Sequence, residues 1–350
     1  MVQFEYVGNL HIHSIHSDGA EDTPGIAKAA AGVGLDFVCL NDHDFLTDKL
    51  YLEEEGFYNN VLVLVGLEIG RRYHHYLAYD LIEEVAGDDL TPQEVIDSVS
   101  KQGGFGFLAH PFEKGMPFLQ GSVAFTWNDL LVKGFTGICI WNFSSRWKER
   151  VRSPAHGIFH LVFKHVTLKG PSQETLSFWD AACRERRVVG IGGSDAHATD
   201  FNWGPTTFRP FTYSVLLNSI NTHILLPEKL PPALKAAKKE VYRALKSGRL
   251  FAAHDGLCQA RGFRFDFMAD DGSSLVIGEE GPFQKGVLLI KTPRRSKIRL
   301  IRDGLFAEQW LDSEVSYRLE GRGVYRVEVF YKVHLFGWRP WIFSNPIYLR

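Results

Sequence analysis

Histidine and carboxylate side chains recur along the first 200 residues, at the ends of what read as successive β-strands. Imidazole nitrogens and carboxylate oxygens are the ligands that zinc, manganese and iron take in proteins. If these strands form a barrel, their ends share one rim and the side chains can converge there. The pattern therefore predicts the metal centre of a metallohydrolase barrel. The segments are His11-Ile12-His13, Ser17-Asp18-Gly19, Asn41-Asp42-His43-Asp44, Gly66-Leu67-Glu68, His74-His75, Ala109-His110-Pro111 and Ser194-Asp195-Ala196-His197.

The elements that must position these side chains follow an α/β pattern over the first 250 residues. Short apolar runs alternate with helical patterns, which is typical of βα units around a parallel sheet. Thr23 with Pro24, and Thr91 with Pro92, have the cap-plus-proline signature of helix starts. The expected strands cover residues 9–13, 35–40, 61–65, 76–81, 105–109, 137–141 and 188–191.

The remainder of the chain divides into an insertion and a second domain. Residues 142–175 read as a long insertion over the rim, and a helix at 234–246 closes the large domain. From about residue 259 onward the pattern changes to alternating residues and turn signals, which predicts a small antiparallel β-sandwich. We therefore expect a barrel domain over 1–257 and a β-sandwich over 258–350.

Composition and charge narrow the function classes. The net charge of −2 gives no reason to expect a membrane surface, or a nucleic-acid partner beyond nucleotides. The four cysteines are far apart and form no CxxC pair, as expected for reduced residues. The first residues, MVQFEYVGNLHIHS, lack a basic start and an apolar run, so we expect a cytoplasmic protein.

Five motifs, in this order, resemble those of the PHP (polymerase and histidinol phosphatase) family of metal-dependent phosphoesterases. They are NLHIHSIHSDG, LNDHD, GLEIG, LAHP and GGSDAH, and the resemblance covers about residues 8–255. It implies a distorted (β/α)7 barrel with two or three divalent metal ions, manganese, zinc or iron. Carried over to this sequence, the family pattern places His11, His13, Glu68 and Asp195 on a first metal, Glu68, His75 and His110 on a second, and Asp18, His43 and His197 on a third.

Other polar residues near these motifs have two readings each. His75 is preferred to His74 as a ligand because the sequence after it resembles the family's short strand. His16 is a candidate for a substrate-facing or outer-shell group. One of Asp42 and Asp44 could orient an imidazole, or both could be structural.

Two further groups could serve the site or only the fold. Arg146 and Arg150 lie in the basic run of the insertion and are candidates for a phosphate clamp; a solvated surface is the alternative. His254-Asp255, at the expected domain junction, could pair locally or contribute to the site.

The function predicted from these residues is hydrolysis of a small phosphate ester by metal-activated water. His11, His13, Glu68, His110 and Asp195 would form the catalytic centre, without a protein nucleophile. Two alternatives stay open. One is a metallohydrolase of carbamates, carboxylic esters or amides, since barrels with this motif set and a C-terminal β-domain also resemble the carbaryl-hydrolase branch. The other is a non-catalytic metal-binding PHP module.

Overall fold

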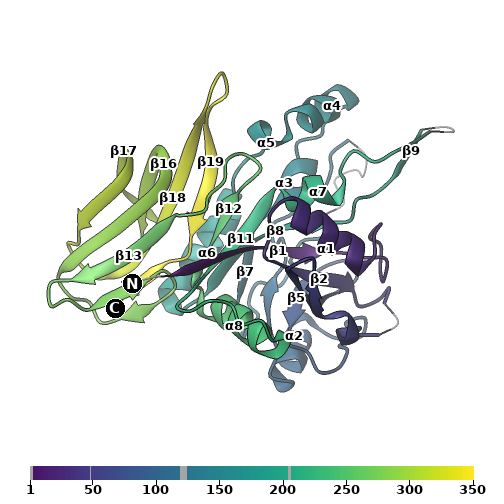
Figure 1. Cartoon of the computed structure of the whole chain (residues 1–350), viewed down its shortest axis with the longest axis horizontal. Helices are drawn as coiled ribbons and strands as arrows, with labels where there is room; N and C mark the ends of the chain where they lie inside the picture. Colours follow the sequence, from purple (N-terminus) through teal and green to yellow (C-terminus); the bar gives the residue numbers. More distant parts are fainter. Residues whose placement is uncertain (1–2, 48, 119–123, 204–205) are drawn as a thin grey trace.

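Seven strands close into a barrel in the computed structural model of the chain, which describes residues 3–47, 49–118, 124–203 and 206–350 (Figure 1). Each strand expected from the sequence is present. The central strand β4 is buried along its whole length, as expected for a strand covered on both faces. In ring order the strands are β1 (Phe4–Ile12), β2 (Phe37–His43), β4 (Val61–Ile69), β5 (Tyr76–Tyr79), β6 (Phe105–Leu108), β7 (Gly137–Asn142) and β8 (Val189–Ala196), which pairs back to β1.

The barrel is mixed and departs from a regular (β/α)7 repeat. Strand β5 runs antiparallel to both β4 and β6, whereas the other neighbouring pairs in the ring are parallel. Only residues 70–75 separate β4 from β5. A segment this short cannot hold the crossover that a parallel connection needs, so the chain turns back.

Helices cover the outside of the barrel. The start of α1 differs by one residue from the sequence expectation: Asp22 caps the helix by accepting from the Gly25 amide at 2.8 Å. Helix α2 begins as expected, because Thr91 and Glu94 form a capping box ahead of it. The helices here are α1 (Thr23–Gly32), α2 (Pro92–Lys101), α6 (Gln173–Glu185), α7 (Tyr213–Leu217) and α8 (Leu234–Ser247), with a short 3-10 turn at Leu52–Glu54 and small strands β3 (Gly56–Tyr58), β9 (Phe201–Trp203) and β10 (Thr206–Phe208).

The expected insertion after β7 contains three short helices, α3 (Phe143–Lys148), α4 (Pro154–Val162) and α5 (Lys164–Thr167). Figure 1 shows α4 and α5 above the barrel strands, with α5 beside the upper part of β19. Arg339 donates to the carbonyl of Val166, and the rings of Phe163 and Phe336 lie 5.6 Å apart. The insertion therefore contacts the C-terminal part of the chain.

The C-terminal strands continue the sheet of the barrel. The first half of β1 pairs with β11, β11 pairs with β12, and β12 pairs with β19, all antiparallel. Phe251 of β12 shares a buried cluster with Trp341 of β19. A boundary at residue 257 and a separate sandwich therefore remain predictions. The strands are β11 (Ile220–Leu226), β12 (Leu250–His254), β13 (Arg264–Ala269), β14 (Ser274–Val276), β15 (Glu280–Gly281), β16 (Gly286–Arg302), β17 (Leu305–Arg318), β18 (Gly323–Val333), β19 (Gly337–Ser344) and β20 (Ile347–Leu349).

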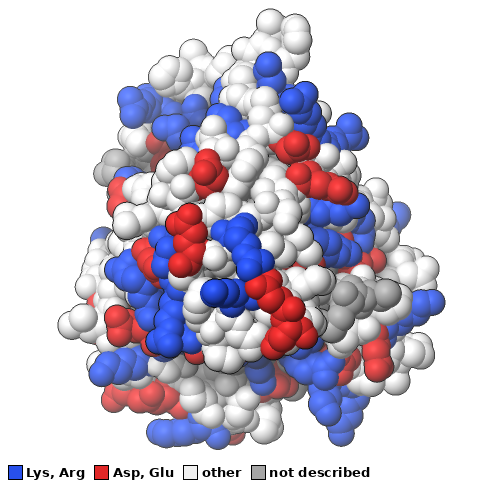
Figure 2. Space-filling view, turned by 90° about the vertical axis from the view of Figure 1, so that its left-hand side faces the viewer, with Lys and Arg blue, Asp and Glu red and all other residues white. Residues whose placement is uncertain are grey.

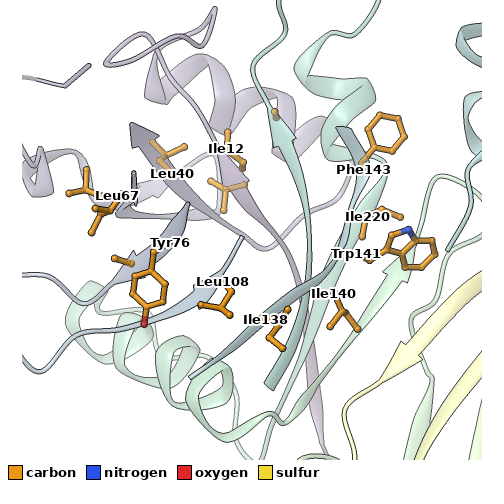
Figure 3. Close-up of a cluster of buried hydrophobic side chains, with 14 of the residues drawn as sticks. Ile12, Leu40, Leu67, Tyr76, Leu108, Ile138, Ile140, Trp141, Phe143 and Ile220 are labelled. Atoms are coloured by element: carbon orange, nitrogen blue, oxygen red, sulfur yellow. The ribbon is translucent and has the colours of Figure 1, made fainter. Parts of the chain in front are cut away.

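A buried apolar layer fixes the strands that carry the histidines and carboxylates. Ile12, Leu40 and Leu67 belong to one cluster with side chains of α1 (Figure 3). Ile12 stands between His11 and His13, and Leu67 precedes Glu68. Because successive side chains of a regular strand point to opposite faces, packing of Leu67 directs Glu68 to the other side, and packing of Ile12 does the same for His13.

The outer surface of the C-terminal strands carries charges of both signs. Figure 2 shows Lys and Arg interspersed with Asp and Glu on this face, and ion pairs such as Arg318–Asp270 and Lys291–Glu314 lie on these strands. This face offers no broad basic surface for a nucleic-acid backbone. Among the described residues, no helix has the length and apolarity to cross a bilayer.

Candidate metal centre

Three of the expected ligands have an unusual backbone conformation. His11, His110 and Asp195 have φ values of 70°, 27° and 56°, in the left-handed region that residues with a side chain rarely adopt. The pairing of β1 with both β2 and β8 shifts register between Leu10 and Ile12, around His11. His11 therefore lies at a bulge in β1 and, with His13, faces Glu68. Such strain is typical of functional positions.

Glu68 lies at the centre of the cluster and presents one oxygen to each of two groups of side chains. Its Oε2 lies 3.0 Å from His11 Nε2 and 3.2 Å from His13 Nε2. Its Oε1 lies 2.8 Å from His75 Nδ1 and 3.2 Å from His110 Nε2. A carboxylate placed in this way can bridge two cations.

Two further groups of ligand atoms surround Glu68. Asp195 Oδ1 lies 3.4 Å from His11 Nε2 and 3.6 Å from His13 Nε2, which completes the first set. Asp18 lies 3.3 Å from His197 Nε2, 3.9 Å from His43 Nε2 and 3.5 Å from His13 Nδ1. The structure thus brings all nine expected ligands into one cluster. Within each of its groups the ligand atoms lie within 4.8 Å of one another: His11, His13, Glu68 and Asp195; His13, Asp18, His43 and His197; His43, Glu68 and His75; and His110, Glu113 and Asp195.

The charges of the cluster suit cations. Burial opposes ionisation of Glu68 and Asp195, but the imidazoles, His11 foremost, outweigh it and hold the pKa of both carboxyls well below the usual range. Burial lowers the pKa of His43 to about 3. At His110 burial acts in the same direction, but the hydrogen bond with Glu68 and neighbouring carboxylates raise its pKa to about 9. A cation therefore meets ionised carboxylates and must displace protons from some imidazoles.

Unpartnered buried nitrogens show that the cluster fits metal ions. His11 Nε2, His13 Nε2 and His43 Nδ1 face a Glu68 oxygen at 3.0–3.4 Å but form no hydrogen bond among the described residues, and His75 Nε2 and His11 Nδ1 are likewise buried without one. Buried polar atoms are normally satisfied, so such a set needs an explanation. His110 donates from Nδ1 to the Phe125 carbonyl at 2.9 Å, so the proton that a metal displaces is the one on Nε2. A metal at these nitrogens would satisfy them.

Four other histidines and carboxylates of the motifs have structural partners. His16 Nε2 lies 2.8 Å from Glu54, and His74 Nε2 accepts from the amide of Asn128 at 3.1 Å. Asp42 accepts from the Ser14 amide and hydroxyl, and Asp44 accepts from the amides of Gly70 and Gly87. Neither aspartate has an imidazole partner among the described residues, so the structural reading of both is the one that fits.

His254 and Asp255 lie apart from the cluster. His254 Nε2 is 3.2 Å from His165 Nδ1 of the insertion. Asp255 accepts from Asn221 and lies 2.9 Å from His223 Nε2. The two residues therefore contact different elements, His254 the insertion and Asp255 strand β11.

Within the basic run of the insertion, Lys148 lies beside the metal cluster, whereas the expected Arg146 and Arg150 contact backbone carbonyls elsewhere. Arg146 donates from Nε to the Gly170 carbonyl at 2.8 Å, and Arg150 donates to the Thr167 carbonyl. Lys148 instead forms an ion pair with Glu113 at 2.7 Å. Burial opposes its charge, but Glu113 and then Asp195 raise the pKa of Lys148.

Sequence reasoning missed Glu113 and Asn142, whose amide donates to Asp195 Oδ2 at 3.3 Å, and it placed the clamp of the basic run on Arg146 and Arg150 rather than on Lys148. Helical spacing was the available signal, because residues 142, 145 and 148 share one face of a helix that begins at the rim. Glu113 follows His110 by three residues, but nothing in LAHPFE distinguishes it from a solvated carboxylate.

Comparisons with known proteins give remote similarities. No protein-family model matches the chain. An alignment of 118 residues is 28% identical to the uncharacterized protein MJ1587 of Methanocaldococcus jannaschii, and it covers 30% of this chain and 67% of that protein.

Two solved structures are similar at low sequence identity. A two-domain protein from Bacteroides vulgatus that contains a predicted PHP-like metal-dependent phosphoesterase has a TM-score of 0.45 at 16% identity, over 98% of this chain and 95% of that one. A Bifidobacterium adolescentis protein, inferred to be a metal-dependent phosphoesterase, has a TM-score of 0.32 at 17% identity, over 54% of this chain and 87% of that one.

Proposed function

We propose that this protein is a metal-dependent phosphoesterase of the PHP type, which hydrolyses a small phosphate ester with water activated at two or three divalent cations. The observation that carries the proposal is the convergence of all nine expected ligands, from separate strand ends, into one cluster around Glu68. Independent histidines and carboxylates of unrelated roles would have no reason to meet there. Zinc, manganese and iron all suit this mixture of imidazole and carboxylate.

The donor sets suggest which residues would hold each cation. His11, His13 and Asp195 would share a first cation with Glu68, and His75 and His110 would share a second with the other Glu68 oxygen. Asp18, His43 and His197 would hold a third. When bound, divalent cations supply the Lewis acidity that lowers the pKa of water and neutralises phosphoryl oxygens.

The chain itself positions and insulates these groups. Asn142 holds Asp195 by donating to Oδ2, and the Phe125 carbonyl fixes the tautomer of His110. Glu68 is fully buried, so its interactions with charges are stronger than they would be in water. A buried pair of ionised carboxylates would repel an anionic ester, and this is why the proposed reaction depends on cations.

The test is hydrolysis of a chromogenic panel by purified, manganese-loaded protein: a phosphomonoester, a phosphodiester, and an aryl carbamate or ester. We expect turnover of a phosphoester and a loss of more than about 100-fold in Asp195→Ala, because removal of a ligand should exceed the effect of an outer-shell change. Asp200→Ala is the matched control, since Asp200 is exposed and pairs with Arg209. Metal content is measured for each variant.

Two results would contradict the proposal. If Asp195→Ala hydrolysed the phosphoester as fast as wild type, the metal-dependent mechanism would be wrong. Turnover of the carbamate or ester alone would move the protein to the carbonyl-hydrolase class, in which the same ligands serve a different substrate.

A further inference from the structure

Lys148 is a nearly buried ammonium at the edge of the metal cluster. It is the last residue of α3, and its side chain is 19% exposed. It pairs with Glu113, whose side chain is fully buried and whose Oε2 accepts from Ser145 Oγ at 2.6 Å. That same Oε2 lies 3.6 Å from His110 Nδ1, so the pair stands beside an expected metal ligand.

The pair holds Lys148 in place without saturating it. An ammonium has three N–H donors, and Glu113 is its one ion-pair partner among the described residues. Lys148 Nζ also lies 5.7 Å from the ring of Phe125, the residue whose carbonyl fixes His110. N–H donors of the Lys148 ammonium therefore remain available to a ligand bound between Lys148 and the metal cluster.

Two other cations of this run, Arg146 and Arg150, contact partners outside the metal cluster. Arg146 is held by Gly170 and by Glu149, and Arg150 is held by Thr167. A lysine with no role beyond the surface would be exposed, as is Lys114, whose side chain is 56% exposed. A buried lysine charge is costly unless an opposite charge or a bound ligand compensates it. Its partner Glu113 is a buried carboxylate, which in turn needs a cation.

We propose that Lys148, positioned by Glu113, binds a non-bridging oxygen of the substrate's phosphoryl group. The inference rests on the proposed function and deepens it, since it names the residue that recognises phosphate. Lysine suits this role as a compact charge with several donors. A neutral ester would gain nothing from this ammonium, so Lys148 would select for phosphorylated substrates.

The experiment uses the metal-loaded full chain and inorganic phosphate as the probe. Lys148→Met with Glu113→Gln removes both charges together, so that no buried carboxylate is left unpaired. Lys148→Arg keeps the charge, and Lys114→Met is the control, a lysine one residue from Glu113 that pairs with Glu174 on the surface. Phosphate affinity is measured by calorimetry, kcat and KM are measured for a phosphomonoester, and metal content is measured for all variants.

We expect the double variant, compared with wild type at equal metal content, to bind phosphate about 10- to 100-fold more weakly, as for a charged hydrogen bond. KM should rise more than kcat falls, Lys148→Arg should restore part of the affinity, and Lys114→Met should stay within about twofold. Phosphate affinity within twofold of wild type in the double variant would overturn the inference, and so would metal-loaded wild type that binds no phosphate. Because calorimetry needs no turnover, phosphate binding through Lys148 without phosphoester hydrolysis would refute the proposed function alone.

Discussion

His223 should make the stability of this protein depend on pH in the alkaline range. Its imidazole is fully buried between two carboxylates, with Nδ1 2.8 Å from Glu5 and Nε2 2.9 Å from Asp255. Glu5 also pairs with Arg264 of β13 at 2.7 Å. This charged group joins β1, β11 and the segment after β12 to the C-terminal strands, where the sheet of the barrel continues.

The magnitude follows from the shifted pKa. Burial alone would lower the pKa of His223, but Asp255 and Glu5 outweigh burial and raise it to about 9 from an ordinary 6.5. This difference corresponds to about 3 kcal/mol of unfolding free energy. Because the folded-state pKa is raised, the contribution is fully present below pH 6.5 and is lost as the pH rises through about 9.

The assay compares urea unfolding of wild type and His223→Gln from pH 6 to pH 10, followed by tryptophan fluorescence at equal metal content. Glutamine fills a similar volume but cannot carry the charge. The stability difference between the two proteins should be about 3 kcal/mol larger at pH 6 than at pH 10. Groups that do not contact His223, the metal ligands among them, cancel in this difference. His334→Gln is the control, since His334 is exposed after β18.

A difference between wild type and His223→Gln that stays constant over this range would refute the reasoning. It would mean that His223 keeps the same protonation state in the folded and unfolded chains. The imidazole nitrogen shifts of His223 in a labelled sample measure the same pKa directly, and a midpoint near 6.5 would contradict the buried charge.

Two further predictions concern the metal centre and the packing of the C-terminal strands. Metal binding should release protons and strengthen with pH by up to about tenfold per unit below pH 9, because the pKa of His110 is raised to about 9; calorimetry in buffers of different ionisation enthalpy measures this, and a pH-independent affinity would contradict it. Arg326→Met should destabilise the protein by about 3–5 kcal/mol in urea unfolding, because it leaves Asp180 of α6, bound at 2.6 and 2.8 Å, buried without its partner. Arg326→Met combined with Asp180→Leu should recover part of the loss, and an equally unstable double variant would argue against the ion pair as the cause.

Part of the fold was open to prediction because the signals are local. Apolar runs between turn and helix signals marked all seven barrel strands, since a strand buried on both faces must be apolar along its length. The reversed direction of β5 was not expected, because the strand expected at 61–65 left ten residues before Tyr76, and only the extension of β4 to Ile69 makes the connection too short for a crossover. Continuity of β12 with β19 was not expected either, because residues far apart in the sequence leave no local trace of their register.

The choice between neighbouring candidates needed the tertiary structure. His74 and His75 differ by one position, and only the start of β5 at Tyr76 places His75 against Glu68. Arg146, Lys148 and Arg150 share one basic run, and the phase of α3 decides that Lys148 meets Glu113 beside the cluster. A rotation of about 100° per residue separates these side chains, and the sequence does not give the orientation of the helix on the barrel.

The sequence by itself determined the chemistry available to this protein: imidazoles and carboxylates at successive strand ends, of the kind that bind divalent cations. Their identity and their spacing are covalent facts of the chain. The tertiary structure decided their geometry, through the bulge at His11, the two oxygens that Glu68 offers to two groups, and the buried pair of Lys148 with Glu113. These features depend on strands and helices packing across long separations in sequence, where many weak contacts set distances that no local pattern encodes.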